Sequence, residues 1–177
     1  LGLLIIAFFF ADWAIFRPPL PSYKDTADVI KLETQSGDLV SARYYENEDA
    51  SHTVIFSHGN AEDIGIIEPI AWRLRDLGLN VLTYDYPGYG TSTGSATEAN
   101  AYDAIDSAYD YLVSKKRIDS KQIVLHGRSL GGGVAVDLAS RRPVGGLILE
   151  STFTTAFRVV TRYPVLPFDK FDNMKKI

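Results

Sequence analysis

The sequence predicts an α/β fold, in which a mostly parallel sheet carries helices on both faces. Between residues 53 and 149, short apolar runs alternate with longer segments of helical periodicity, a pattern typical of parallel strands joined by crossover helices. Before this region, residues 28–34 alternate apolar and polar side chains, and a turn at Ser36–Asp38 leads into residues 39–45. This arrangement predicts an antiparallel hairpin at the start of the sheet.

The strands that follow the hairpin are short. Residues 53–56 are continuously apolar, as expected for a strand buried on both faces. Further strands are expected at residues 80–84, 122–126 and 146–149. In sheets of this kind, ligands bind beyond the carboxyl ends of the strands. We therefore expect the polar segments after these strands to gather at one rim, namely residues 58–60, 85–88, 129 and 150–151.

Three helices are expected between the strands. The first covers residues 66–77, and Gly78 is its expected C-cap. Residues 95–98 have the Ser-x-x-Glu pattern of a capping box, which predicts a helix from Ser95 to about residue 114. A third helix is expected at residues 130–140.

Composition excludes several classes of function. The chain has 177 residues, which suits one domain, and its net charge of −4 argues against nucleic acid as a partner. It contains no cysteine, so a disulfide, a thiolate metal site and a cysteine nucleophile are all excluded. The three histidines lack the spacing of metal ligands, and we expect neither a metal nor an organic cofactor.

The N-terminal segment is strongly apolar. Only Asp12 interrupts residues 1–16, which are fewer than the roughly 20 residues needed to cross a bilayer. We interpret residues 1–17 as an incomplete membrane anchor or uncleaved signal segment, on an unknown side of the membrane; the alternative is an apolar helix packed on the domain. Residues 18–27 form a proline-rich linker, and residues 28–177 form the folded domain.

Ser129 is the candidate nucleophile. It is the serine of a Gly-x-Ser-x-Gly motif at residues 127–131, between a predicted strand and a predicted helix. Such a turn exposes the serine hydroxyl and directs the helix N-terminus towards it. A second match at residues 90–94 contains Ser92, but it lies in a loop several residues after its strand. We expect the Ser92 hydroxyl to make a loop hydrogen bond.

The stabilising groups for a developing oxyanion are expected on both sides of Ser129. One backbone N–H comes from the residue after the nucleophile, and the other comes from the loop after the strand at residues 53–56. These considerations select Leu130 together with Asn60, with Ala61 as the alternative to Asn60.

No histidine follows His126 in this chain, although the base of such a site ordinarily follows the serine and the acid. His58 is the alternative base, but it precedes Ser129 and is expected to be a structural loop residue. His126 is expected to be a packed side chain. We expect Asp85 to hold its Pro-Gly turn, and Glu150 is the alternative triad acid.

Four motifs occur in order, at residues 57–61, 85–94, 127–132 and 149–154. Together they resemble the α/β-hydrolase domain proteins of the ABHD type, which include relatives of protein depalmitoylases and bacterial serine-aminopeptidase-like members. The resemblance implies an α/β-hydrolase fold whose catalytic Asp and His follow residue 177. By this comparison residues 28–177 are the N-terminal two-thirds of the domain, and the last strands are missing.

The expected function is that of a serine hydrolase which forms an acyl-enzyme on Ser129 and cleaves a carboxylic ester or thioester. A small acyl ester or thioester, an acylated protein and a lipid are the candidate substrates, and the N-terminal segment makes the membrane a candidate partner. The alternatives are a serine aminopeptidase-like peptidase and a non-catalytic binding or scaffold protein. Without the Asp and His, residues 1–177 alone are expected to be nearly inactive.

Overall fold

The computed structural model describes residues 12, 13, 15–159 and 169–177. Within these residues, six strands form one mixed sheet in the order β1-β2-β4-β3-β5-β6. The strands are β1 (Ile30–Glu33), β2 (Leu39–Tyr45), β3 (Thr53–Ser57), β4 (Asn80–Tyr84), β5 (Ile123–Arg128) and β6 (Gly146–Glu150). β1 pairs antiparallel with β2, and β2 with β4. The remaining pairs are parallel, so the predicted α/β class and the N-terminal hairpin are confirmed.

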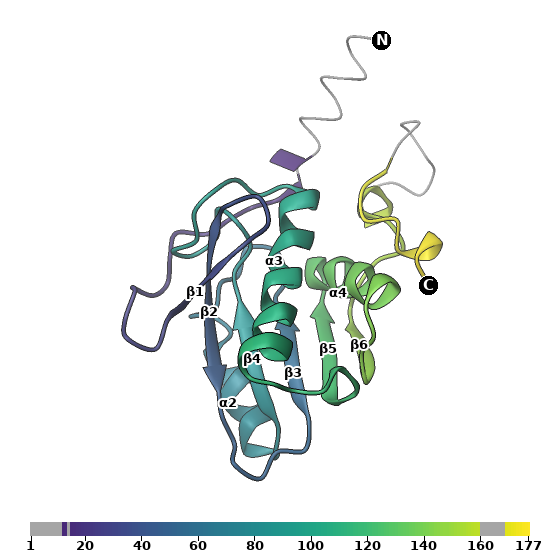
Figure 1. Ribbon diagram of the computed structural model, residues 1–177. Coiled ribbons are helices and arrows are strands. Elements are labelled where there is room, and N and C mark those ends of the chain that lie inside the picture. The colour runs from purple at the N-terminus through teal and green to yellow at the C-terminus, as the bar shows by residue number, and fades with distance from the viewer. Residues whose placement is uncertain (1–11, 14, 160–168) are drawn as a thin grey trace, which may run out of the picture.

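Helices cover both faces of the sheet (Figure 1). They are α2 (Glu68–Asp76), α3 (Glu98–Asp110) and α4 (Leu130–Arg141), and the turn Tyr111–Lys115 continues α3 as a π-helix. Figure 1 shows α3 and α4 on the near face and α2 on the far face. Short 3₁₀ turns occur at Ser120–Gln122, Ala156–Val159 and Asn173–Lys175.

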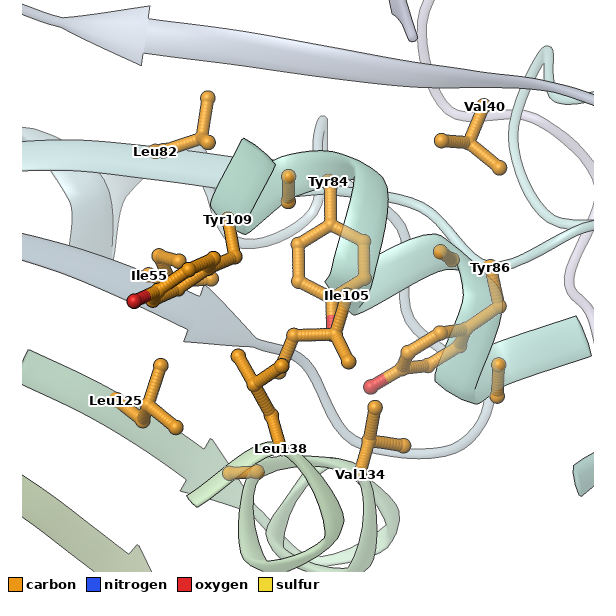
Figure 2. Close-up of a cluster of buried hydrophobic side chains, with 14 of the residues drawn as sticks. Val40, Ile55, Leu82, Tyr84, Tyr86, Ile105, Tyr109, Leu125, Val134 and Leu138 are labelled. Carbon is orange, nitrogen blue, oxygen red and sulfur yellow. The ribbon is translucent and has the colours of Figure 1, made fainter. Parts of the chain in front are cut away.

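The main core lies between the sheet and the helices α3 and α4. Figure 2 shows strand side chains meeting side chains of both helices, and the labelled set comprises Val40, Ile55, Leu82, Tyr84, Tyr86, Ile105, Tyr109, Leu125, Val134 and Leu138. A smaller core on the other face packs α2 against β3 and β4. Burial on both faces explains why the middle of β3, residues 54–56, is continuously apolar.

The expected capping box at Ser95 is wrong. α3 begins at Glu98, and Thr97 is its N-cap, with the Thr97 hydroxyl accepting from the Asn100 N–H at 3.1 Å. The Glu98 carboxylate does not reach back to a cap, because it accepts hydrogen bonds from the Phe171 N–H and the Tyr102 hydroxyl, both at 2.7 Å. Tertiary contacts therefore override the local pattern at this helix end.

The expectation of a membrane segment falls mainly on residues 1–11, which lie outside the described residues. None of the helices in the described part of the chain is long and apolar enough to span a membrane. Phe16 is buried and packs edge-on against the ring of Tyr89, with ring centroids 6.3 Å apart. The end of the apolar segment is thus part of the folded domain.

Candidate active site

Ser129 occupies a sharp turn between β5 and α4. Its backbone angles are φ 52° and ψ −113°, a sparsely populated region for a residue with a side chain, which costs about 1–3 kcal/mol and is common at functional sites. The Ser129 side chain makes no capping hydrogen bond to α4, although serine at this position usually caps a helix. The hydroxyl is thus not used as a cap of this helix.

Glycines around Ser129 allow strand and helix to approach closely. A Cβ on Gly127 would lie 2.4 Å from the carbonyl oxygen of Gly131. A Cβ on Gly131 would lie 2.1 Å from the carbonyl oxygen of Ser57 at the end of β3. No side chain fits at either position, which gives the physical reason for the two glycines of the motif.

The backbone of Ser129 is held by hydrogen bonds to β6, to the loop that follows β6 and to the first turn of α4. The Ser129 N–H donates to the Glu150 carbonyl at 2.9 Å. The Thr152 hydroxyl and the Gly132 N–H donate to the Ser129 carbonyl at 2.9 and 3.0 Å. These three hydrogen bonds offset the strained turn.

The loop after β3 lies beside Ser129, as predicted from the strand ends. β3 and β5 run parallel with Ser57 opposite Gly127, and a Cβ on Gly59 would lie 3.6 Å from the Ser129 Cβ. Asn60 follows in this loop. Leu130 is the first residue of α4, where an N–H has no acceptor within the helix.

The Asn60 side chain fixes the loop. Its Oδ1 accepts from the Tyr89 hydroxyl at 2.7 Å, the Arg17 N–H at 2.9 Å and the Ala61 N–H at 3.0 Å, while its Nδ2 donates to the Ile15 carbonyl. Because the Ala61 N–H is already bonded, the geometry favours Asn60 over Ala61 as the loop donor. The contacts with residues 15 and 17 come from a part of the chain that the sequence analysis did not connect with the site.

His58 is buried, and both of its ring nitrogens face other groups. Nδ1 lies 2.8 Å from the Gly59 carbonyl, and Nε2 lies 3.3 Å from the Asp85 carboxylate without hydrogen-bond alignment. Asp85 in turn accepts from the Ile64 N–H at 2.9 Å and from the Tyr23 hydroxyl. Burial and the Asp85 carboxylate raise the pKa of Tyr23 well above its ordinary value, so the phenol stays protonated. These contacts favour structural roles for His58 and Asp85.

His126 and Glu150 form a pair on the face of the sheet that α2 covers. His126 Nε2 lies 3.2 Å from Glu150 Oε2, and the imidazole packs edge-on against Phe56 with ring centroids 4.8 Å apart.

Ser92 has the loop role expected for it, because its hydroxyl accepts from the Ser41 N–H at 2.9 Å. No sequence pattern pointed to Glu62 and Arg128, whose side chains meet beside Ser129.

In the described part of the chain, no three His, Asp or Glu side chains cluster to hold a metal ion. A groove of about 900 Å³ lies between β1 and α3, and neither Ser129 nor Asn60 lines it. The groove is therefore separate from the candidate site.

The sheet topology and the turn at Ser129 together define an α/β-hydrolase. The chain matches the family described as "Serine aminopeptidase, S33" over residues 48–169, and it belongs to that family. It is 33% identical over 160 residues to human alpha/beta hydrolase domain-containing protein 17B, covering 87% of this chain and 55% of the human protein. It is 42% identical over 170 residues to alpha/beta hydrolase domain-containing protein aho-3 of Caenorhabditis elegans, covering 81% of this chain and 51% of the relative.

Solved structures have the same fold. An α/β-hydrolase from Vibrio vulnificus superposes with a TM-score of 0.72 at 24% identity, over 85% of this chain and 59% of that one. The Pyrococcus furiosus esterase Pf2001 superposes with a TM-score of 0.67 at 21% identity, over 85% and 65% of the two chains. The chain spans about half the length of the curated relatives that it matches.

Proposed function

We propose that the protein is a serine hydrolase that cleaves carboxylic esters or thioesters through an acyl-enzyme on Ser129. The observation that carries the proposal is the position of Ser129, at a positive φ between β5 and the N-terminus of α4. The N-terminus of α4 carries a partial positive charge, which favours negative charge developing beside it. The family membership supports the same class of chemistry.

The reaction proceeds in two steps. The Ser129 oxygen attacks the carbonyl carbon while a base removes the hydroxyl proton, and the N–H groups of Asn60 and Leu130 stabilise the oxyanion. Collapse of this intermediate releases the alcohol or thiol with the proton and leaves the acyl group on Ser129. Water then attacks the acyl-enzyme and releases the carboxylic acid. No metal or organic cofactor takes part.

The proposal assigns the base to a histidine after residue 177, with an aspartate to orient it. His58 and His126 are both directed at other partners. Loss of triad members typically costs about 10⁴–10⁶ in rate. Residues 1–177 alone should therefore give no turnover of p-nitrophenyl acetate above a Ser129→Ala control. A rate that depends on Ser129 in this chain would instead assign the base to His58 or His126.

The decisive experiment labels the full-length protein with a fluorophosphonate probe and measures hydrolysis of acyl esters and acyl thioesters. Ser129→Ala should abolish both labelling and turnover. Ser92→Ala is a matched control, because Ser92 lies in the same Gly-x-Ser-x-Gly pattern, and it should keep both. Labelling that survives Ser129→Ala would contradict the proposal, and an unlabelled protein would favour a non-catalytic binding role.

A peptidase is the second candidate, because the family description names a serine aminopeptidase. Such an enzyme would use the same nucleophile and the same oxyanion donors. A panel of aminoacyl amides beside acyl esters separates the two candidates. Faster cleavage of the amides, lost in Ser129→Ala, would replace the ester proposal with the peptidase.

We also propose that the N-terminal apolar segment anchors the protein to a membrane, which suits acylated proteins or lipids as substrates. The structure indicates where a test deletion has to stop. Phe16 is buried, and the backbone of Ile15 and Arg17 holds Asn60. A variant lacking residues 1–11 should fold and should no longer float with phosphatidylcholine vesicles. Equal flotation of both forms would contradict the anchor.

A further inference from the structure

The Glu62 carboxylate joins the two segments that flank the candidate nucleophile. Its Oε2 accepts a hydrogen bond from the Gly59 N–H at 2.7 Å. Its Oε1 accepts a hydrogen bond from the Arg128 guanidinium at 2.6 Å. Because an ionised group takes part in each, both are charge-assisted hydrogen bonds, which are shorter and stronger than neutral ones.

The two partners of Glu62 are the immediate neighbours of the reacting groups. Gly59 directly precedes Asn60, whose N–H is the proposed loop donor. Arg128 directly precedes Ser129 in the chain. Each partner of Glu62 is therefore one residue away from a group that the proposed mechanism uses.

The hydrogen bonds of Glu62 to Gly59 and Arg128, here called the bridge, lie beyond the last paired residues of β3 and β5. The parallel ladder between β3 and β5 reaches Ser57 and Gly127, so the strands are already held together below the site. Glu62 continues the connection beyond the ends of the strands. The Glu62 side chain thus connects the loop to the turn, in addition to the ladder that already pairs the strands.

Partial burial and a contact with Phe56 hold the two side chains of the bridge in place. The side chains of Glu62 and Arg128 are only 25% and 21% exposed, which limits screening by water and salt. The Arg128 guanidinium also lies over the ring of Phe56, 5.6 Å from its centroid, which holds the arginine from the side of the sheet. An ion pair on a freely exposed surface would not be fixed in this way.

We propose that Glu62 is a positioning residue of the oxyanion site, which holds the Asn60 N–H at its working distance from Ser129 through Gly59 and Arg128. This inference rests on the proposed serine hydrolase function. Glu62 touches neither the substrate nor the reacting atoms and acts only through its two partners. The substitution Glu62→Gln removes the charge and keeps the shape, so the Asn60 N–H remains present but less well placed.

The test measures kcat and KM of the full-length protein with p-nitrophenyl acetate. A donor that is misplaced but not removed should cost less than the roughly 10²–10³-fold loss seen on deleting one. We expect Glu62→Gln to lower kcat about 10-fold with KM within about twofold, since the donor acts on the transition state. Affinity for a trifluoromethyl ketone, which forms an oxyanion on the serine, should fall by the same factor.

Arg128→Gln removes the guanidinium that donates to Glu62, at the other end of the same bridge. If Glu62 and Arg128 act as a unit, the double variant should lose no more rate than the worse single variant. Arg128→Gln also serves as the second measurement if Glu62→Gln does not fold. Asp110→Asn is the matched control, because it breaks a 2.7 Å ion pair with Arg142 on the exposed side of α3, and it should leave kcat unchanged.

The outcomes separate this inference from the proposed function. Unchanged kcat in Glu62→Gln and Arg128→Gln, with turnover still abolished by Ser129→Ala, overturns the positioning role and leaves the hydrolase intact. An increase in KM alone also overturns it, because it assigns the bridge to substrate binding. Turnover that persists in Ser129→Ala rejects the proposed function itself.

Discussion

Replacing Gly131 with alanine tests the close packing on which the turn at Ser129 depends. The added Cβ would lie 2.1 Å from the Ser57 carbonyl oxygen, 2.5 Å from the Ser57 carbonyl carbon and 2.7 Å from the His58 carbonyl oxygen. Real Cβ contacts are essentially never shorter than 3.0 Å. All three atoms belong to the backbone, so no side chain can rotate away.

The cost follows from the movement that this contact requires. The N-terminus of α4 must move from β3 by about 0.9 Å to reach 3.0 Å, although α4 is buried from Leu130 to Leu138. Overpacking of a core typically costs about 1–3 kcal/mol, and a clash with two consecutive carbonyl groups belongs at the upper end. A loss of about 3 kcal/mol corresponds to a fall in Tm of about 6–12 °C for a chain of this size.

Thermal and urea unfolding followed by circular dichroism measure this loss. Gly146→Ala is the control, because its Cβ would meet only the Val124 methyl groups, at an ordinary 3.8 Å, and its Tm should change little. The movement also separates Leu130 from the loop at Asn60, so turnover by the full-length protein should fall in any Gly131→Ala variant that remains folded. A Tm of Gly131→Ala equal to that of Gly146→Ala would refute the packing argument.

Three further predictions concern buried polar groups. Tyr84→Phe should lower the free energy of unfolding by about 1–2 kcal/mol, because it leaves the buried Ser57 hydroxyl without its 2.7 Å partner, and adding Ser57→Ala should recover part of the loss in urea unfolding. Burial alone would raise the pKa of Asp63, but hydrogen bonds from Ser22 and from two loop N–H groups lower it below its ordinary value of 3.8. The Asp63 carboxylate therefore stabilises the fold fully above about pH 4 and less as the pH falls, so Asp63→Asn should show a smaller stability difference between about pH 7 and about pH 3. Burial raises the pKa of several tyrosines, which stabilise the fold below their ordinary pKa of 10 and less as the pH rises. These tyrosines are Tyr23, Tyr84, Tyr86, Tyr89 and Tyr102. Their phenolate absorbance should therefore appear only when the protein unfolds at alkaline pH. Ionisation of these side chains before unfolding would contradict the prediction.

Much of the fold could be predicted because it depends on local periodicity. Continuous apolar runs marked the parallel strands. Gly78 was expected as the C-cap of α2, but Leu77 is the cap, and Gly78 follows it at a positive φ. The start of α3 at Glu98 could not be predicted from the capping pattern at Ser95, because the Glu98 carboxylate is bonded to Phe171, 73 residues away. A capping pattern describes only neighbours in sequence, and here a distant segment takes its acidic side chain.

In the candidate site, too, only some of the residues could be predicted from local sequence. Ser129 and Leu130 were accessible from the sequence, because the turn needs a strand and a helix immediately beside it. The supports of Asn60 were not, since they come from Arg17 and Tyr89, at sequence separations of 43 and 29 residues. Glu62 and Arg128 are 66 residues apart, and no local pattern distinguishes this pair from other charges on the surface.

The two Gly-x-Ser-x-Gly motifs demonstrate that surroundings determine what a serine can do. At residues 90–94 both glycines adopt positive φ while Ser92 does not, and the hydroxyl of Ser92 is bonded to the backbone of β2. At residues 127–131 the serine itself takes the positive φ, because strand and helix meet there without an intervening loop. The strain at Ser129 persists because Glu150 and Thr152 hold it from later in the chain. The backbone geometry of Ser129 is therefore a property of β5, α4 and β6 together, and the five-residue motif alone does not produce it.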